Sequence, residues 1–425
     1  MRAVQQKQKS VAVIGQGYVG LPLALQAVRA GFQVIGLEVD EQRVARLLAR
    51  HSYVEDVSDL ELQEAFDCGR YRVSPDFGDA EGFDIAVISV PTPLTGGEPD
   101  LSAVIGSATT LAPLIKPGAV VILESTTYPG TTEDVVAPLL EQGSGLKAGR
   151  DFALGYSPER IDPGNATWTF AKTPKLVSGV NEYSQIKVKE FFDTIVEHTV
   201  VVSGTREAEL AKLMENTFRS VNIALVNETA MFAADMGIDI WEAIRAAGTK
   251  PFGYMAFTPG PGVGGHCLPI DPIYLDWLSR EKTGRPLGFV NLANDINRGM
   301  PGYVVQRIGE TLKKYDRVLA DSRVLLLGLA YKANTADLRE SPAMDVALKL
   351  LEAGVEVRAV DPHATPGTLD PRIEIVQLTA DELASADVTV LLTDHDCFDY
   401  DLIESASQHV FDTRNRLRNR AVERI

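Results

Sequence analysis

A cysteine lies among glycines and prolines in the segment PGPGVGGHCLPIDP, which covers residues 259–272. Asp271 followed by Pro272 is typical of a helix N-cap and the first residue of a helix. Cys267 is therefore predicted just before a helix N-terminus, a position that lowers a thiol pKa from about 8.5 and increases the thiolate fraction. Because the thiolate is the nucleophile, Cys267 is a candidate for covalent chemistry. A capping role for Asp271 can coexist with a catalytic one.

Two polar residues of a predicted long helix could act with this cysteine. Lys212 and Asn216 are four residues apart, so their side chains project from the same face of a helix. Taken alone, the pair is typical of a solvated helix face. The cysteine loop favours a catalytic interpretation, because its glycines admit a ligand close to the backbone and a nearby lysine favours a thiolate.

A second group of residues is typical of a dinucleotide site. The hexapeptide GQGYVG supplies Gly15, Gly17 and Gly20, and Glu38 ends the next predicted strand. The glycines allow a pyrophosphate to approach a helix N-terminus, and an acidic residue at this strand end binds ribose hydroxyls and repels a 2′-phosphate. The pattern therefore predicts NAD. The alternatives are a glycine turn that only packs a helix on a strand and, through Arg43 in the next helix, a preference for NADP.

The elements that position these residues repeat along the chain. Short apolar strands alternate with helices or turns, first in VAVIG, QVIGLEVD, DIAVISV, AVVILES and FALGYS, then again in RVLLLGLAYK, VEVRAVDP and ADVTVLLTDHD. One long helix is predicted from Arg206 to about Met236, either as a buried core helix or, as we prefer, as a spine that packs against a second subunit. The predicted fold class is α/β, with two Rossmann-like, doubly wound domains joined by a long central helix. The predicted domains are residues 1–204, 205–302 and 303–425.

The second Rossmann-like unit has GLAYK where the first has GQGYVG. Without those glycines it should not hold a second dinucleotide. Lys332 and Arg339 instead supply cations that suit another phosphate-bearing ligand, or Arg339 and Glu340 simply form surface ion pairs.

Composition excludes several classes of function. The 425 residues carry a net charge of −17, which argues against nucleic acid as a partner. Three scattered cysteines predict neither a disulfide framework nor a metal site, and we interpret Cys68 and Cys397 as packing residues. The N-terminus lacks a signal-peptide pattern, and no apolar run approaches the roughly 18 residues of a membrane span. A cytoplasmic protein is expected.

Six motifs together resemble a known family: VIGQGYVGLPLA, STTYPGTT, YSPERIDPGN, ELAKLMENTFRSVNIALVNE, GGHCLPIDP and GLAYKANTADLRESP. In order and spacing the chain is similar to the UDP-glucose/GDP-mannose dehydrogenase family of nucleotide-sugar 6-dehydrogenases. The resemblance implies a four-electron, NAD-dependent oxidation of a sugar C6 alcohol to a carboxylate through a cysteine thioester. It also implies an obligate homodimer joined through the central helix.

The resemblance also implies a role for individual residues. Cys267 matches the nucleophile, and Lys212 and Asn216 match groups that stabilise an oxyanion. Thr126, Glu159 and Asp271 match groups that position water or take protons. The implied cofactor contacts are Gly15, Gly17, Tyr18, Val19, Gly20, Glu38, Arg43, Thr92, Thr126 and Arg339, so Arg339 serves the cofactor and not, as its position alone suggests, the sugar nucleotide. The implied substrate contacts are Glu159, Arg160, Lys212, Asn216, Lys250, Tyr254, Gly264 and Lys332, with Lys250 where the family often has an arginine that reaches the neighbouring subunit.

Two departures from the UDP-glucose members bear on the substrate. Ile270 replaces a lysine before the motif aspartate, and RIDPGN replaces FLRE after the Pro-Glu. Both features look more like members that act on UDP-N-acetylhexosamines. The alternatives are the same chemistry on UDP-glucose or on a dTDP- or GDP-hexose, and a two-electron NAD dehydrogenase of the hydroxyacid type, which would not need Cys267. A module that senses NAD without chemistry would leave the cysteine, lysine and asparagine without a joint purpose.

Overall fold

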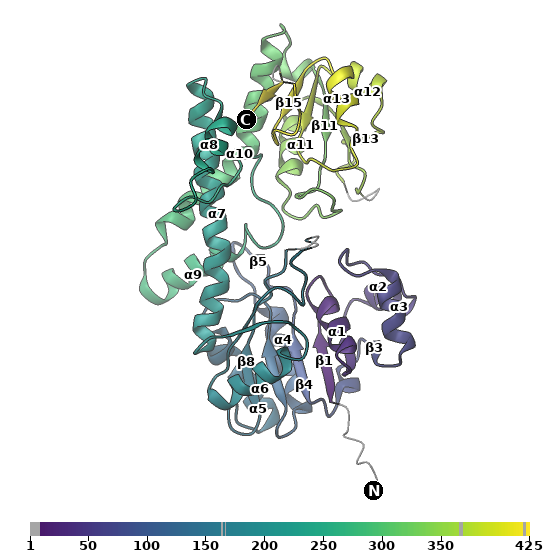
Figure 1. Cartoon of the computed structure of the whole chain (residues 1–425), viewed down its shortest axis with the longest axis vertical. Helices are drawn as coiled ribbons and strands as arrows, with labels where there is room; N and C mark the ends of the chain where they lie inside the picture. The colour runs from purple at the N-terminus through teal and green to yellow at the C-terminus, as the bar shows by residue number, and fades with distance from the viewer. Residues whose placement is uncertain (1–8, 163–164, 166, 365–368, 420–421) are drawn as a thin grey trace. The chain divides into compact units, whose positions relative to one another are not determined.

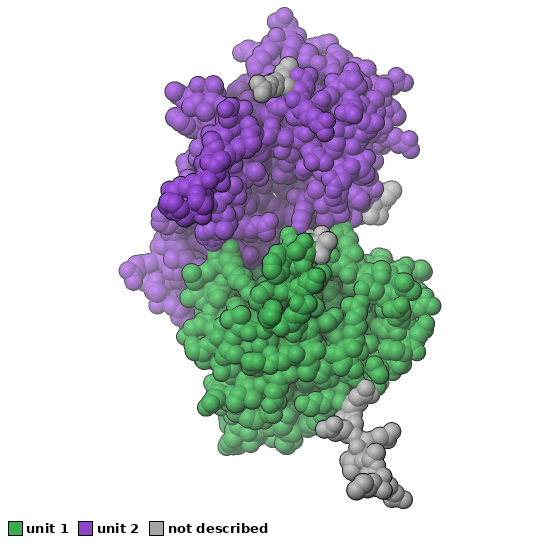
Figure 2. All heavy atoms as spheres, in the orientation of Figure 1, with its two compact units in different colours: residues 1–215 green, residues 216–425 purple. Residues whose placement is uncertain are grey.

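The computed structural model describes residues 9–162, 165, 167–364, 369–419 and 422–425. Contacts divide the chain into two compact units, residues 1–215 and residues 216–425 (Figure 2). The boundary falls inside one continuous helix, α7 (Thr205–Asp235), so the two units share this element. Each unit is described by itself below.

Unit 1 is built on a six-stranded parallel sheet with the strand order β3-β2-β1-β4-β7-β8 (Figure 1). In chain order this is 3-2-1-4-5-6, the arrangement of doubly wound dinucleotide-binding sheets. The strands are β1 (Ser10–Ile14), β2 (Gln33–Leu37), β3 (Tyr71–Ser74), β4 (Ile85–Ile88), β7 (Val120–Leu123) and β8 (Ala153–Tyr156). The short pairs β5 (Leu94–Thr95) with β6 (Glu98–Pro99) and β9 (Lys175–Val177) with β10 (Thr199–Val201) lie outside this sheet.

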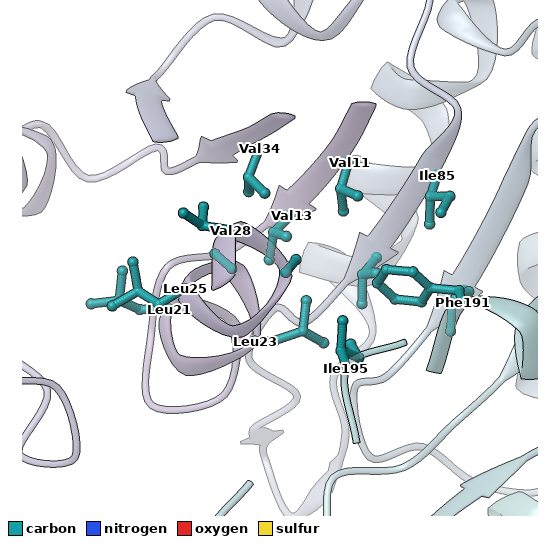
Figure 3. Close-up of a cluster of buried hydrophobic side chains, with 14 of the residues drawn as sticks. Val11, Val13, Leu21, Leu23, Leu25, Val28, Val34, Ile85, Phe191 and Ile195 are labelled. Carbon is teal, nitrogen blue, oxygen red and sulfur yellow. The ribbon is translucent and has the colours of Figure 1, made fainter. Parts of the chain in front are cut away.

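The sheet is stabilised because both of its faces are apolar. Val11 and Val13 of β1 belong to one buried cluster, whereas the alternate residues Ala12 and Ile14 belong to another. Figure 3 shows the first cluster, where the apolar side of helix α1 (Gly20–Arg29) and Phe191 meet the strands. Each buried valine or leucine contributes roughly 1.5–3 kcal/mol relative to the exposed side chain.

Helices and short helical turns connect the strands of unit 1. After α1 these are α2 (Glu41–Leu48), α3 (Asp59–Asp67), η1 (Phe77–Ala80), α4 (Ser102–Leu111), η2 (Ala112–Leu114), η3 (Thr131–Val136), α5 (Ala137–Ser144) and α6 (Glu182–Phe192). The predicted strands and the first crossover helix are confirmed, with ends that differ by at most three residues.

Helix α7 confirms the predicted long helix and starts one residue earlier. It ends before Gly237, whose φ of +66° is a left-handed conformation that favours glycine. One face of α7 is apolar and exposed, with Met214, Phe218, Leu225 and Phe232 all more than half exposed. In the described structure, therefore, α7 is not a buried core helix.

Unit 2 repeats the architecture of unit 1. Its parallel sheet has the order β13-β12-β11-β14-β15-β16, again 3-2-1-4-5-6 in chain order. The strands are β11 (Arg323–Leu327), β12 (Glu356–Val360), β13 (Glu374–Ile375), β14 (Val388–Leu391), β15 (Val410–Asp412) and β16 (Glu423–Arg424). The helices are α8 (Ile240–Ala247), α9 (Asp271–Thr283), α10 (Gly288–Lys313), η4 (Leu319–Asp321), α11 (Pro342–Glu352), α12 (Ala380–Ser385) and α13 (Tyr400–Ala406). The predicted second Rossmann-like unit is thus confirmed.

Candidate active site

The glycine turn after β1 has the geometry of a dinucleotide-binding turn. Gly15 has a φ of +88°, and a Cβ atom there would lie 2.7 Å from the carbonyl oxygen of Ser89. A Cβ atom on Gly20 would collide with the carbonyl of Gly15, whereas one on Gly17 would meet no atom within 4 Å. Gly15 and Gly20 therefore close the turn, and Gly17 leaves open space beside it. Helix α1 starts at Gly20 without a side-chain cap, and the amides of Leu21 and Leu23 donate to the carbonyls of Gly17 and Val19. The helix dipole therefore favours an anion at this turn.

Glu38 lies at the end of β2 and is buried against this turn. Its carboxylate accepts hydrogen bonds from the backbone N–H groups of Gln16 at 3.1 Å and Asp40 at 3.1 Å. Arg43 places its guanidinium 3.7 Å from the same carboxylate and 5.4 Å from the ring of Tyr53. The positive charge of Arg43 is thus offset by Glu38.

Gln16, which the sequence did not single out, stiffens the turn. It is fully buried, its side-chain amide donates to the carbonyls of Val13 and Gly15, and the Tyr71 hydroxyl donates to its Oε1. Burial raises the pKa of Tyr71 well above its ordinary value, so this phenol keeps its proton. The remaining predicted cofactor residues of unit 1 are partly buried Tyr18, Val19 and Thr126 and buried Thr92. Thr92 follows β4 and Thr126 follows β7, at the same edge of the sheet as Gly15.

A buried ion cluster lies at the same edge of the sheet. The ammonium of Lys175 is 2.5 Å from Glu124 Oε1 and 2.6 Å from Glu159 Oε2. Glu159 also accepts the backbone N–H groups of Arg160 and Ile161 through Oε1, at 2.7 Å and 2.8 Å. Of these residues only Glu159 and Arg160 were predicted, because a lysine at the start of a short apolar strand carries no catalytic signature in the sequence.

Arg160 joins this edge to helix α7. Its guanidinium pairs with Glu215 at 2.7 Å and donates to the carbonyl of Pro174 at 2.7 Å. The pair borders an open pocket of about 240 Å³ that Trp168 and Thr173 also line. Arg160 can therefore present its remaining polar surface to a ligand in this pocket.

Glu209 fixes helix α7 against the loop that carries Thr126. It is fully buried and accepts hydrogen bonds from Gly130 N at 2.6 Å, Thr132 N at 2.9 Å and Thr132 Oγ1 at 2.7 Å. Burial raises its pKa to about 7, and these hydrogen bonds act in the opposite direction. Lys212 lies three residues later on the helix and is itself 8% exposed. Glu209 thus ties the turn of α7 that precedes Lys212 to the loop at Gly130 and Thr132.

In unit 2, Asn216 contacts the helix that follows the cysteine loop. Its Nδ2 lies 2.5 Å from Oδ2 of Asp271, which is 4% exposed. The prediction that Asp271 is an N-cap is wrong, because Ile270 holds that position and Asp271 is the first residue of α9. Its carboxylate instead binds Asn216, which could not be foreseen from local sequence alone.

Cys267 is exposed, in the turn that leads into α9. Its backbone carbonyl accepts the amides of Ile270 and Asp271, at 3.3 Å and 2.9 Å, so the turn is tied to the start of the helix. The side chain is therefore accessible for reaction while its backbone is held by hydrogen bonds. Cys68 and Cys397 are exposed as well, so their interpretation as packing residues is wrong. Cys68 follows helix α3, where its thiol contacts the carbonyl of Ala65.

The glycines before Cys267 allow its loop to pack on the segment after β11. A Cβ atom on Gly264 would lie 2.7 Å from the carbonyl oxygen of Glu340, and one on Gly265 would lie 2.8 Å from the ring of Tyr331. The amide of Gly265 donates to the carbonyl of Arg339 at 3.1 Å. Close approach of the Glu340 carbonyl and of the Tyr331 side chain thus explains why these two positions are glycine.

The predicted cations of unit 2 lie on this same segment. Arg339 is exposed and forms a two-pronged ion pair with Asp337, at 2.6 Å for the shortest contact. Burial and the positive charge of Arg339 lower the pKa of His266, so the residue beside Cys267 is neutral near pH 7. Lys332 is half-buried one residue after Tyr331. The structure therefore brings Cys267, Lys332 and Arg339 to one loop cluster.

Lys250 and Tyr254 lie in an exposed segment between α8 and the cysteine loop. Phe252 and Met255 in the same segment are 70% and 64% exposed. Within the described residues, no group of three or more His, Cys, Asp or Glu side chains could hold a metal ion. No helix of the described part of the chain has the length and apolar character needed to cross a membrane.

Comparison with known proteins gives matches along nearly the whole chain. Three domain descriptions of the UDP-glucose/GDP-mannose dehydrogenase family match: the NAD binding domain over residues 9–197, the central domain over residues 206–299 and the UDP binding domain over residues 325–419.

Individual relatives match at moderate identity. The chain is 36% identical over 411 residues to a UDP-N-acetyl-D-mannosamine dehydrogenase of Pyrococcus horikoshii, covering 95% of each chain. It is 36% identical over 358 residues to a UDP-N-acetyl-D-glucosamine 6-dehydrogenase of Pseudomonas aeruginosa, covering 84% of this chain and 83% of that one. Among solved structures, a UDP-D-ManNAc dehydrogenase of Pyrococcus horikoshii superposes with a TM-score of 0.88 at 34% identity and 98% coverage of both chains.

Proposed function

We propose a complete reaction for this chain, which belongs to the UDP-glucose/GDP-mannose dehydrogenase family and is a nucleotide-sugar dehydrogenase. The substrate is a UDP-N-acetylhexosamine, and the C6 alcohol is oxidised to the carboxylate with NAD as the oxidant. Relatives named for UDP-N-acetylmannosamine and UDP-N-acetylglucosamine support this substrate class, as do Ile270 and the RIDPGN segment.

The residues of the glycine turn fit a nicotinamide dinucleotide. The open side of Gly17 and the uncapped start of α1 suit a pyrophosphate, and Glu38 is positioned to meet ribose hydroxyls. The pairing of Arg43 with Glu38 favours NAD over NADP, because it leaves less positive charge for a 2′-phosphate. When bound, the dinucleotide accepts a hydride from the sugar carbon in each of two oxidations.

Covalent attachment to Cys267 makes the second oxidation possible. An aldehyde does not donate hydride readily until a nucleophile adds to it. The exposed thiolate of Cys267 adds to the C6 aldehyde, and oxidation of this thiohemiacetal gives a thioester. Water then attacks the thioester carbon, the carbon–sulfur bond breaks, and the sulfur keeps the electron pair.

The polar residues around the reaction assist by holding charge and moving protons. Lys212 and Asn216 stabilise the oxyanion, and Asp271 takes protons at the turn of Cys267. The contact of 2.5 Å between Asn216 Nδ2 and Asp271 Oδ2 supports this assignment most directly. Thr126 and Glu159 position water. The substrate is bound by Arg160, Lys250, Tyr254, Gly264 and Lys332, and Arg339 contacts the cofactor.

The exposed apolar face of α7 supports a homodimer joined through this helix. Phe218, Leu225 and Phe232 are each more than half exposed. A contiguous apolar patch of this kind is typical of a surface that contacts another protein. Replacing Phe218 and Phe232 together by glutamate should shift the protein from dimer to monomer in analytical ultracentrifugation. The enzyme is expected to work in the cytoplasm, where its three exposed thiols stay reduced.

The test is a panel of nucleotide sugars in which NADH is counted per sugar consumed. Two NADH per UDP-N-acetylhexosamine are expected, with lower kcat/KM for UDP-glucose and for dTDP- or GDP-hexoses. Cys267→Ala should bind sugar nucleotide and cofactor yet lose the thioester route, and Cys267→Ser should accumulate a slowly hydrolysed ester that mass spectrometry detects. If Cys267→Ala still forms two NADH per sugar at a rate near wild type, the covalent mechanism is wrong.

A further inference from the structure

Glu124, Lys175 and Glu159 form a buried cluster of three charged side chains in unit 1. Three separate segments of unit 1 supply it: the end of β7, the first residue of β9 and the loop after β8. Side-chain exposures are 0% for Glu124, 3% for Lys175 and 10% for Glu159. The rings of Phe170 and Phe192 lie 5.2 Å from the ammonium and help to exclude water. Buried charges of this kind cost stability unless they are fully paired, so the arrangement suggests a functional reason.

The charges of the cluster do not cancel. The carboxylates of Glu124 and Glu159 share the single ammonium of Lys175. Burial raises the pKa of Glu124, Lys175 lowers it, and the charge of Glu159 raises it. Near neutral pH one carboxyl group can therefore keep a proton, as in other sites where two carboxyl groups share a small volume.

The hydrogen bonds decide which carboxyl group holds that proton. Glu159 accepts from Lys175 and from two backbone amides, whereas Oε2 of Glu124 is buried without a partner among the described residues. Burial acts against the charge of Glu159, but Lys175 and the amides lower its pKa below the ordinary value. Burial raises the pKa of Glu124 to about 7, against the opposing effect of Lys175. Glu159 is thus the anion and Glu124 the proton carrier.

We propose that Lys175 and Glu124 are positioning residues for Glu159, with Lys175 fixing its carboxylate and Glu124 receiving the proton that Glu159 takes from water. The proposal rests on the role given to Glu159 under the proposed function. As the water oxygen bonds to the thioester carbon, one water proton moves to Glu159. Lys175, which contacts both carboxyl groups, takes up this proton and gives one of its own to ionised Glu124, so Glu159 returns to the carboxylate and Lys175 stays an ammonium. The sulfur of Cys267 keeps the electrons of the broken carbon–sulfur bond.

Glu124→Gln separates the proton role from the positioning role. The amide oxygen of glutamine can still accept from Lys175, so Glu159 keeps its place, but glutamine cannot take a proton. The wild-type rate of thioester hydrolysis should rise with pH through about 7 as Glu124 ionises. In Glu124→Gln this rise of the hydrolysis rate with pH should be absent, and the rate should fall about 10- to 100-fold. KM should be nearly unchanged, and the covalent sugar adduct should accumulate in quenched samples.

Lys175→Met and Lys175→Arg test the positioning role. Methionine should reduce hydrolysis further, because two buried carboxyl groups then lack a cation, and arginine should recover part of the rate. Lys187→Met is the matched control, since the ion pair of Lys187 with Glu190 on α6 is exposed. Thermal melting verifies that each variant is folded.

The outcomes separate this proposal from the function on which it rests. If Cys267→Ala is inactive while Glu124→Gln keeps the wild-type hydrolysis rate and pH profile, the proposed function stands and the role of Glu124 is overturned. If folded Lys175→Arg is no more active than Lys175→Met, the positioning role of Lys175 is overturned. A Cys267→Ala enzyme with the wild-type rate overturns both, because no thioester is then hydrolysed.

Discussion

The two sheets of this protein share one backbone plan but use the turn after the first strand differently. Gly15 and Gly328 both have a positive φ, +88° and +81°, and both donate to the last residue of the second strand, Leu37 or Val360. In unit 1 the acidic residue of the second strand accepts one amide of the turn. In unit 2 its counterpart, Asp361, accepts two, from Leu329 at 2.7 Å and Ala330 at 3.0 Å.

The position of the next helix increases the difference. In unit 1, α1 begins at Gly20, six residues after the end of β1, so the N-terminus of the helix lies directly after the turn. In unit 2, α11 begins only at Pro342, and the loop between carries Lys332 and Arg339. The turn of unit 1 thus leads directly into a helix N-terminus that favours an anion, whereas the turn of unit 2 binds its amides to Asp361 and is followed by side-chain cations. A Rossmann-like strand order alone does not specify a dinucleotide site.

The largest expected effect comes from alanine at the two turn glycines. Each alanine would need a left-handed backbone, and its Cβ atom would press on a carbonyl oxygen, of Ser89 for Gly15 and of Thr393 for Gly328. Both substitutions should lower the free energy of unfolding by roughly 2–4 kcal/mol, measured by urea denaturation. Only Gly15→Ala should also abolish NAD binding in calorimetry. Loss of NAD binding in a folded Gly328→Ala protein would contradict the division of roles.

Asp361→Asn should have a smaller, pH-dependent effect. Burial acts against the charge of Asp361, but His395 and backbone amides lower its pKa to about 2, below the ordinary value of 3.8. Because the folded pKa is the lower one, the carboxylate stabilises the fold above about pH 4, and this contribution is lost as the pH falls through about 2. Asp361→Asn should therefore cost roughly 1.5–3 kcal/mol at pH 7 and progressively less in acid, measured by urea unfolding at several pH values.

Asp370→Asn is the matched control for this experiment. The Arg372 guanidinium lowers the pKa of Asp370 to about 2 as well, but this carboxylate is only half-buried and its partner Arg372 is 60% exposed, so solvent weakens the pair. Its substitution should leave the stability nearly unchanged at every pH. Glu124 in unit 1 should behave in the opposite sense to Asp361, since its raised pKa means that stability is lost as the pH rises through about 7. A pH-independent cost of Asp361→Asn would show that its charge does not stabilise the turn.

Sequence patterns predicted the parts of the fold that depend on neighbours along the chain. Apolar runs bounded by glycine predicted both sheets, and the absence of proline and glycine between Arg206 and Gly237 predicted the long helix. The glycine spacing also gave the turn at Gly15. These signals are local, because strand burial, helix period and turn conformation are determined over a few residues.

The errors and omissions concern residues whose partners are distant in sequence. Lys175 lies 51 residues from Glu124, and Asp271 lies 55 residues from Asn216. A lysine in a strand and an aspartate before a proline both have ordinary local explanations, a surface charge and an N-cap. Only the three-dimensional pairing shows that one is a buried cation and the other a partner of the long helix.

Gly17→Ala should sharpen the comparison without affecting stability. A Cβ atom at Gly17 meets no protein atom within 4 Å, so the variant should melt at the wild-type temperature. The added methyl group would occupy space that the pyrophosphate needs, and the Kd for NAD should rise about tenfold. The counterpart in unit 2 is buried Ala330, and Ala330→Gly should leave the Kd unchanged. Unchanged NAD affinity in Gly17→Ala would place the pyrophosphate elsewhere.

The smallest expected effect is a change in cofactor choice from Glu38→Gln. The amide side chain can still accept the backbone N–H of Gln16, so the turn should keep its shape. Loss of the carboxylate removes repulsion of a 2′-phosphate and frees Arg43, now 3.7 Å from Glu38, to attract it. The ratio of kcat/KM for NADP to that for NAD should therefore rise several-fold, measured with the same sugar nucleotide.

The double variant Glu38→Gln, Arg43→Ala identifies which of these two causes dominates. If the freed arginine attracts the phosphate, the gain for NADP should largely disappear when Arg43 is removed. If removal of repulsion suffices, the gain should persist, because Arg43 is 44% exposed and its attraction is then weakened by solvent. A wild-type enzyme that already prefers NADP would contradict the assignment of Glu38 to the ribose. The contrast between Glu38, which selects the cofactor, and Asp361, which only holds the turn of unit 2, would then fail.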